Sequence, residues 1–215
     1  MSPVEWLPRN AGQLWQATMD HVFLTLIAVA GGLAISLVLA LVIRADRRWS
    51  APLTAVTGAL YTIPSLALFA VLVPLTGLSV LTAEIGLISY TLLILLRSLV
   101  SGLDAVPPDV LEAAKGSGMS SRQRLLLVEL PLAVPYLVAG LRVAVVTTIG
   151  LVMVTALIGE GGLGQVMLRG FNFRNWTAVY AGAVLTVGLA VVADLGLVII
   201  GRRLTPWAGR RASRA

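Results

Sequence analysis

Cysteine is absent from this sequence, and charged residues are scarce. Without cysteine, disulfide bonds and thiolate metal sites are excluded. Only 12% of the 215 residues are charged, against roughly 25% in soluble globular domains. Histidine occurs once, as His21 at the start of the first apolar run. We expect it to be an ordinary interfacial residue rather than a metal ligand or a proton carrier.

Sequence motifs of catalysis are missing as well. The chain has no G-x4-G-K-[ST] phosphate loop, no G-x-S-x-G nucleophile elbow and no H-E-x-x-H zinc motif. Gly159, Gly161 and Gly164 fit the dinucleotide pattern G-x-G-x-x-G, but they follow an apolar membrane run instead of a strand, so that interpretation is rejected. We therefore expect no catalytic site, no metal and no bound cofactor in this chain.

Apolar residues make up 58% of the chain. A helix needs roughly 20 apolar residues to cross a bilayer. The sequence thus predicts an all-α membrane protein with about five transmembrane helices. Residues 1–21 are expected to form an external or interfacial segment, 22–203 the transmembrane domain and 204–215 a basic cytoplasmic tail. The predicted helices cover residues 22–43, about 52–73, 80–100, 131–158 and 176–200.

The basic residues predict the orientation of these helices, because Lys and Arg accumulate on the cytoplasmic side of membrane proteins. Only three of them, Arg9, Arg169 and Arg174, would lie on the same side as the N-terminus, whereas twelve would lie on the other side. We therefore predict that the N-terminus is outside and the C-terminus is cytoplasmic. The net charge of +6 lies in short clusters between apolar runs, so no nucleic-acid partner is expected. The residues on the cytoplasmic side would be Arg44, Arg47, Arg48, Arg97, Lys115, Arg122, Arg124, Arg202, Arg203, Arg210, Arg211 and Arg214.

Two ionisable residues fall well inside predicted helices, Arg142 in the fourth and Asp194 in the fifth. At 1.5 Å per residue, they lie roughly 16 Å and 10 Å from the cytoplasmic ends of their helices. An unpaired charge at such depth is unfavourable, so one hypothesis is that the two residues pair. The other is that each side chain reaches the cytoplasmic surface separately. Glu84 and Arg97, near the ends of the third helix, are expected to extend to the interface.

The longest polar interruption between apolar runs carries a specific pattern. Residues 112–135 read EAAKGSGMSSRQRLLLVELPLAVP, in which Gly118 follows the EAA triplet and V-x-L-P ends at Pro131. The spacing EAA-x3-G-x9-V-x-L-P resembles the signature of the permease subunits of type I bacterial ABC importers. A surface helical hairpin between two membrane helices is the alternative, and it does not explain the spacing.

This resemblance implies that a loop at about residues 104–130 forms cytoplasmic coupling helices that dock on an ATPase. The partners it implies are a second permease subunit, identical or homologous, two ATP-binding subunits that hold ATP and Mg, a soluble substrate-binding protein and the lipid bilayer of the bacterial inner membrane. ATP hydrolysis would then belong to the partner, and this chain would not be an enzyme. The coupling residues implied are Glu112, Ala113, Ala114, Gly118 and Met119.

Two further stretches resemble one branch of these importers, the permeases for glycine betaine, carnitine and choline. They are YTIPSLALFAVLVPLTG, residues 61–77, and LLRSLVSGLDAVPPDVLEAAKGSGMS, residues 95–120. Aromatic faces recognise quaternary ammonium groups, so Tyr61 and Tyr90 are candidate pathway residues together with Pro64. Pro64 is expected to kink the second helix. Ordinary structural tyrosines and an ordinary proline kink are the alternative.

The segment after the fourth helix resembles the IGxGGLG segment on the external side of the family. It implies a tight turn at an outer gate, whereas a flexible connector is the alternative. Its residues are Gly159, Glu160, Gly161, Gly162 and Gly164.

The function expected from these features is the ATP-driven uptake of an osmoprotectant such as glycine betaine, carnitine, choline or proline betaine. A permease for another small polar solute such as methionine is the main alternative. An intramembrane enzyme would need more ionisable groups at membrane depth than Arg142 and Asp194. A stand-alone channel would have no use for a docking loop.

Overall fold

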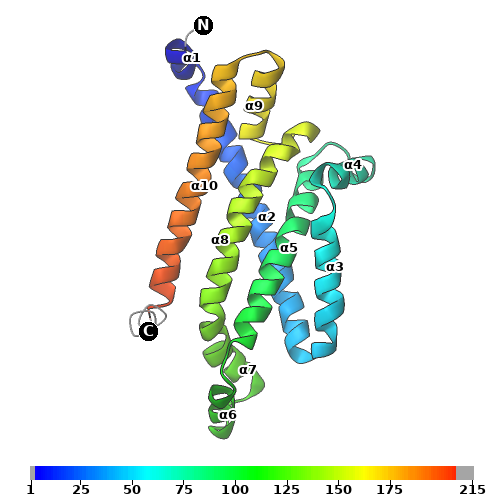
Figure 1. The fold of residues 1–215 in the computed structure, drawn as a ribbon, viewed down its shortest axis with the longest axis vertical. Helices are drawn as coiled ribbons and strands as arrows, with labels where there is room; N and C mark the ends of the chain where they lie inside the picture. The colour runs from blue at the N-terminus through cyan, green and yellow to red at the C-terminus, as the bar shows by residue number, and fades with distance from the viewer. Residues whose placement is uncertain (1–2, 207–215) are drawn as a thin grey trace.

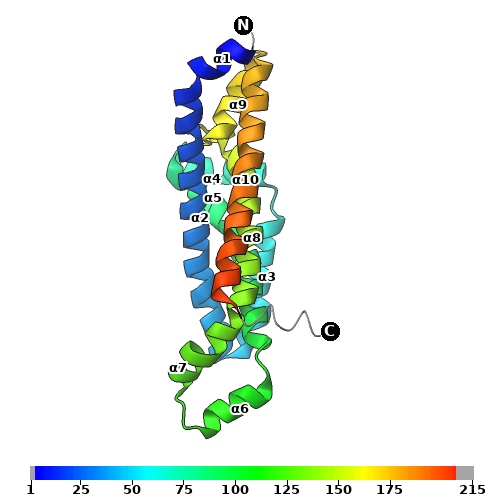
Figure 2. The same ribbon diagram turned by 90° about the vertical axis from the view of Figure 1, so that its left-hand side faces the viewer.

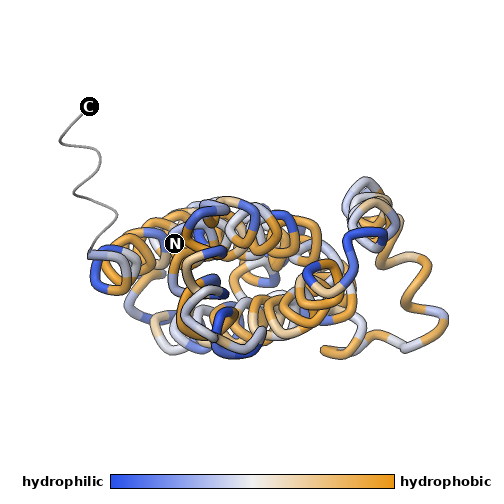
Figure 3. The backbone as a smooth tube through the Cα atoms, turned by 90° about the horizontal axis from the view of Figure 1, so that it is seen from below, coloured by the Kyte–Doolittle hydropathy of each residue, from blue (hydrophilic) through white to orange (hydrophobic). Residues whose placement is uncertain are grey.

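A computed structural model describes residues 3–206, which form an elongated bundle of helices with no strand in this range (Figure 1). Its long helices run along one axis, and the N-terminus lies at one end of that axis. Large apolar side chains are exposed along the bundle. The view along the axis shows hydrophobic residues through much of the bundle, with hydrophilic ones among them (Figure 3). Such an apolar exterior suits a lipid environment.

Within the described residues, four continuous helical stretches are long and apolar enough to cross a membrane, and the number is five if a bent pair of helices counts as one more span. The all-α fold with about five spans is therefore confirmed. Arg210, Arg211 and Arg214 of the predicted basic tail lie outside the described residues. The four stretches are α2 (Ala11–Ala45), α5 (Val80–Asp104), Ser121–Ile158, which contains α8 (Leu130–Thr155), and α10 (Trp176–Leu204).

The first long helix begins eleven residues earlier than predicted, at Ala11 instead of residue 22. Only the short helix α1 (Pro3–Arg9) precedes it, so residues 11–21 are a continuous part of the first long helix. The predicted start at residue 22 was placed where the apolar run begins. No proline interrupts the backbone there, however, and polar side chains such as Gln13 and Gln16 are compatible with continued helix.

The second span is broken at Pro64, where a single kinked helix was predicted. Helix α3 (Ser50–Thr62) and helix α4 (Ser65–Thr76) meet at an angle of 95°. Proline has no N–H to donate and forces the preceding residue out of the helical region. Ile63 accordingly adopts φ −65° and ψ 127°. Two non-helical residues therefore turn the chain sharply instead of bending it.

The helices α2 and α5 approach each other closely near their middle. A Cβ atom on Gly32 would lie 1.7 Å from the Thr91 hydroxyl, so only glycine fits this contact. One turn further on, the Ser36 hydroxyl donates to the Leu92 carbonyl at 3.3 Å. Close backbones and interhelical hydrogen bonds are what hold membrane helices together, since lipid provides no hydrophobic force between them.

The polar loop between α5 and α8 forms an elbow of two short helices, α6 (Pro108–Gly116) and α7 (Ser121–Arg124). Gly118 makes the turn between them with φ +78°. Ser120 begins α7 with a reciprocal cap, since its N–H donates to the Gln123 side chain and its hydroxyl accepts from the Gln123 N–H. The elbow projects from the end of the bundle opposite the N-terminus (Figure 2).

Candidate functional site

Three of the five residues predicted for coupling are exposed on the elbow. Glu112, Ala113 and Gly118 are exposed, and Met119 is half-buried. Ala114 is buried, so it holds α6 against the chain instead of facing outward. Pro107 and Pro108 at the start of α6 separate it from α5, and Gly118 separates it from α7. The exposed side of α6 is therefore a short, rigid surface free to contact another protein.

An ion cluster that the sequence did not predict ties the elbow to α2. The Glu129 carboxylate accepts from Arg44 at 2.5 and 2.8 Å and from Arg124 at 3.1 Å. Arg44 ends α2, Arg124 ends α7 and Glu129 leads into α8 through a π-helical turn. We call these three residues the clamp. The Glu129 side chain is only 7% exposed, so the clamp is largely shielded from water.

The clamp was missed because its three members are far apart in the sequence and each has an ordinary explanation. Arg44 and Arg124 were assigned to the cytoplasmic charge excess. Glu129 was the only acidic residue between the EAA triplet and the next apolar run, which is the signal that could have found it. A neighbouring pair, Arg47 with Asp104 at 2.9 Å, is exposed and contributes little.

The three candidate pathway residues meet at the break between α3 and α4. The Tyr90 hydroxyl donates to the carbonyl of Ile63, the residue before Pro64. The rings of Tyr61 and Tyr90 pack edge to face with centroids 6.0 Å apart. Tyr90 is buried and supports the broken backbone, whereas Tyr61 is exposed.

Arg142 and Asp194 also meet, as the pairing hypothesis proposed. Arg142 Nε and a terminal guanidinium nitrogen donate to the two carboxylate oxygens of Asp194 at 2.7 and 2.9 Å. This two-point geometry joins α8 to α10 and is the strongest arrangement available to such a pair. The alternative, in which each side chain reaches the surface separately, is wrong.

The glycine loop, residues 159–164, folds back over the N-terminal end of the bundle. Gly159 has φ +90° and Gly162 has φ +46°, conformations that favour glycine. A Cβ atom on Gly162 would lie 2.6 Å from the Ala17 carbonyl oxygen and 2.7 Å from the His21 nitrogen. The loop is therefore pressed against α2. The backbone of the loop makes a tight turn there.

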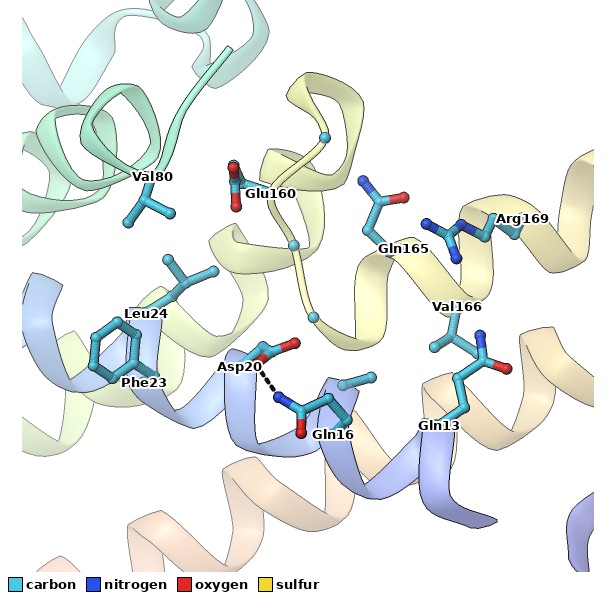
Figure 4. Close-up of a pocket in the computed structure, with 14 residues that line it drawn as sticks. Gln13, Gln16, Asp20, Phe23, Leu24, Val80, Glu160, Gln165, Val166 and Arg169 are labelled. Carbon is cyan, nitrogen blue, oxygen red and sulfur yellow. Dashed lines mark hydrogen bonds between the residues drawn. The ribbon is translucent and has the colours of Figure 1, made fainter. Parts of the chain in front are cut away.

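A cavity of about 590 Å³ lies beside the glycine loop, between it, α2 and α9 (Leu163–Asn172). Glu160 and Asp20 line it from opposite sides, and Gln165 and Arg169 extend along α9 (Figure 4). The Gln16 amide donates to Asp20 at 2.8 Å. These amide and carboxylate groups, with apolar side chains such as Phe23, give the hollow a mixed lining at the N-terminal end of the molecule.

Two buried ionisable residues contradict their predicted positions. His21 is fully buried under the glycine loop and its Nε2 lies 3.0 Å from the Ile149 carbonyl oxygen, so it is not an interfacial residue. Glu84 is only 6% exposed, and its carboxylate has no hydrogen-bond partner among the described residues. Each faces the interior because it lies one turn from a core leucine of the same helix, Leu24 and Leu87 respectively. Among residues 3–206, no group of three or more His, Asp or Glu side chains could hold a metal.

The bundle of apolar helices, with an elbow clamped to one end, defines a membrane permease of the type I ABC importer fold. The chain belongs to the family described as binding-protein-dependent transport system inner membrane component, which matches residues 32–206.

Curated relatives match over almost the whole chain. The osmoprotectant import permease protein OsmW of Salmonella typhimurium is 36% identical over 96% of this chain and 98% of its own length. The choline transport system permease protein OpuBB of Bacillus subtilis is 34% identical over 94% of each chain. The glycine betaine/carnitine/choline transport system permease protein OpuCD of Bacillus subtilis is 37% identical over 92% of this chain and 87% of its own.

Solved structures share the fold at lower sequence identity. An inward-facing structure of the MetNI methionine ABC transporter aligns with a TM-score of 0.79 at 21% identity, covering 92% of this chain and 98% of the other. An amino acid ABC transporter crystallised with histidines aligns with a TM-score of 0.74 at 17% identity, covering 94% and 99%. These likenesses concern the fold alone.

Proposed function

We propose that this chain is the permease subunit of an ATP-driven importer for an osmoprotectant such as glycine betaine, carnitine, choline or proline betaine. Relatives at 32–37% identity over most of the chain are named for choline, carnitine, glycine betaine or osmoprotectants. Methionine is the second candidate, favoured only by the fold shared with a methionine transporter at 21% identity. The sequence relatives therefore favour the osmoprotectants.

ATP hydrolysis is assigned to a separate partner. The sequence has no phosphate loop, so ATP and Mg would be held by an ATPase subunit. The elbow is the part of this chain that would contact it. The exposed side of α6, with Glu112 and Ala113, would fit a cleft on the ATPase, and Gly118 would set the angle between α6 and α7.

The clamp is the observation that carries this proposal. An ATPase that moved the elbow would act on α7, and Arg124 and Glu129 would transmit that movement to Arg44 at the end of α2. Helix α2 reaches the glycine loop at its other end. A single 35-residue helix thus joins the elbow to the opposite face of the membrane.

The proposed assembly contains two permease subunits, identical or homologous, two ATPases and a soluble binding protein. The basic residues of the elbow favour the cytoplasm for that end, and the N-terminus and glycine loop would then face outward. The cavity with Glu160 and Asp20 would lie where a binding protein delivers solute. Residues 159–164 would form the outer gate.

Uptake by the reconstituted importer tests the proposed solute. Proteoliposomes that contain this chain, its ATPase and its binding protein should take up radiolabelled glycine betaine or choline only with ATP. Excess unlabelled glycine betaine, carnitine or proline betaine should compete, and methionine should not. Competition by methionine alone would support the second candidate. Uptake without an ATPase would contradict both.

A further inference from the structure

The paired charges of Arg142 and Asp194 lie more than two turns inside their helices. Arg142 comes twelve residues after Leu130, at the start of α8, or roughly 18 Å along the axis. Asp194 comes ten residues before Leu204, at the end of α10, or roughly 15 Å. The hydrocarbon core is about 30 Å thick. Neither residue is within a turn of the helix end, so the pair is an intramembrane feature.

The pair lines an open groove of about 670 Å³ between α8 and α10. Other lining residues are small or apolar, such as Ala139, Thr147 and Ala190. The Arg142 side chain is 41% exposed and that of Asp194 is 30% exposed. The charges are therefore joined to each other but not covered by this chain. Charged groups at this depth face a protein interior or a wet cavity and not lipid.

Both members of the pair can still bind another molecule. Arg142 uses Nε and one terminal nitrogen for Asp194, whereas a guanidinium group carries five N–H donors. A carboxylate can accept about four hydrogen bonds, and Asp194 accepts two from Arg142. A molecule with one positive and one negative group could add to the pair in antiparallel orientation. It would not have to break the pair first.

We propose that this groove is a transport-path site for small zwitterions. Arg142 binds the solute carboxylate and Asp194 attracts its cationic nitrogen, while the small apolar side chains around them accommodate the methyl groups. The proposal deepens the proposed function and rests on it, since glycine betaine, carnitine and proline betaine are zwitterions. Choline lacks a carboxylate and would engage Asp194 alone. The two charges would thus discriminate between classes of osmoprotectant.

The uptake ratio of glycine betaine to choline tests this assignment. Arg142→Gln should lower glycine betaine uptake at least tenfold more than choline uptake, while Asp194→Asn should lower both by similar factors. Arg142→Gln leaves a carboxylate unpaired, so the double variant Arg142→Gln/Asp194→Asn, which has no charge, controls for stability. Equal losses of both solutes in Arg142→Gln, or full glycine betaine uptake in the double variant, would overturn the site.

A direct binding measurement separates this site from the proposed function. The purified complex of the chain with its ATPase, in lipid nanodiscs without binding protein, should melt at a higher temperature with millimolar glycine betaine than without it. The double variant should show no such shift, and tetramethylammonium should give a smaller one in the unmodified complex. No shift in the unmodified complex would overturn the site even if uptake is observed. A shift without uptake would support the site and contradict the proposed function.

Discussion

Replacing Gly162 with alanine should unfold the contact between the glycine loop and α2. The new Cβ atom would lie 2.6 Å from the Ala17 carbonyl oxygen and 2.8 Å from the His21 Cβ, so backbone must move. Alanine also disfavours φ +46°. Strain and overpacking, each about 1–3 kcal/mol, lead us to expect a loss of about 3–5 kcal/mol in unfolding free energy. The melting temperature of the purified chain measures it.

Gly159→Ala is the matched control for this variant. Gly159 belongs to the same loop and also has a positive φ, of +90°, but a Cβ atom there would meet nothing within 4 Å. Only the conformational strain remains, so Gly159→Ala should lower the free energy of unfolding by about 1 kcal/mol. Equal melting temperatures for the two variants would show that the loop does not press on α2.

Glu129→Ala should disconnect the elbow from α2 and abolish most transport. Removal of one partner from a buried ion pair lowers the free energy of unfolding by about 3–5 kcal/mol. Because the side chains of Arg44 and Arg124 are 22% and 26% exposed, we expect a smaller loss of about 2–4 kcal/mol here. ATP hydrolysis by the assembled importer should continue, because the exposed side of α6 is unchanged. Solute uptake should fall at least tenfold, so the number of ATP molecules hydrolysed per solute should rise by that factor.

Asp104→Ala provides the comparison for the clamp. It removes the exposed pair with Arg47 at the same end of the bundle, which we expect to contribute at most about 1 kcal/mol. Uptake and hydrolysis should both stay near their original values. If Glu129→Ala behaved like Asp104→Ala, the clamp would have no part in coupling.

Features that depend on one stretch of sequence were predictable. Apolar runs of adequate length predicted the spans, and the prolines and glycines around residues 107–118 predicted an elbow between α5 and α8. The pairing of Arg142 with Asp194 was predictable as one of two hypotheses. It followed from the cost of isolated charge at membrane depth and from the similar depths of both residues.

Features that depend on packing between distant stretches were not predictable. A proline predicts a disturbed helix, but it predicts neither the 95° angle between α3 and α4 nor the hydrogen bond from Tyr90 to the Ile63 carbonyl. His21 was expected at the interface because it begins an apolar run, yet the glycine loop covers it. The clamp joins residues 85 positions apart along the chain. Spacing within one segment carries no information about such contacts.

The natural lack of cysteine allows a direct test of how the elbow is used. Ala113→Cys places one thiol on the exposed side of α6, and Phe173→Cys places one at the exposed N-terminal end of the bundle. In membranes that contain the whole importer, a short bifunctional thiol reagent should cross-link Ala113→Cys to the ATPase. An impermeant maleimide added from outside should label only Phe173→Cys. Labelling of Ala113→Cys from outside, without a cross-link to the ATPase, would contradict the coupling role of the elbow.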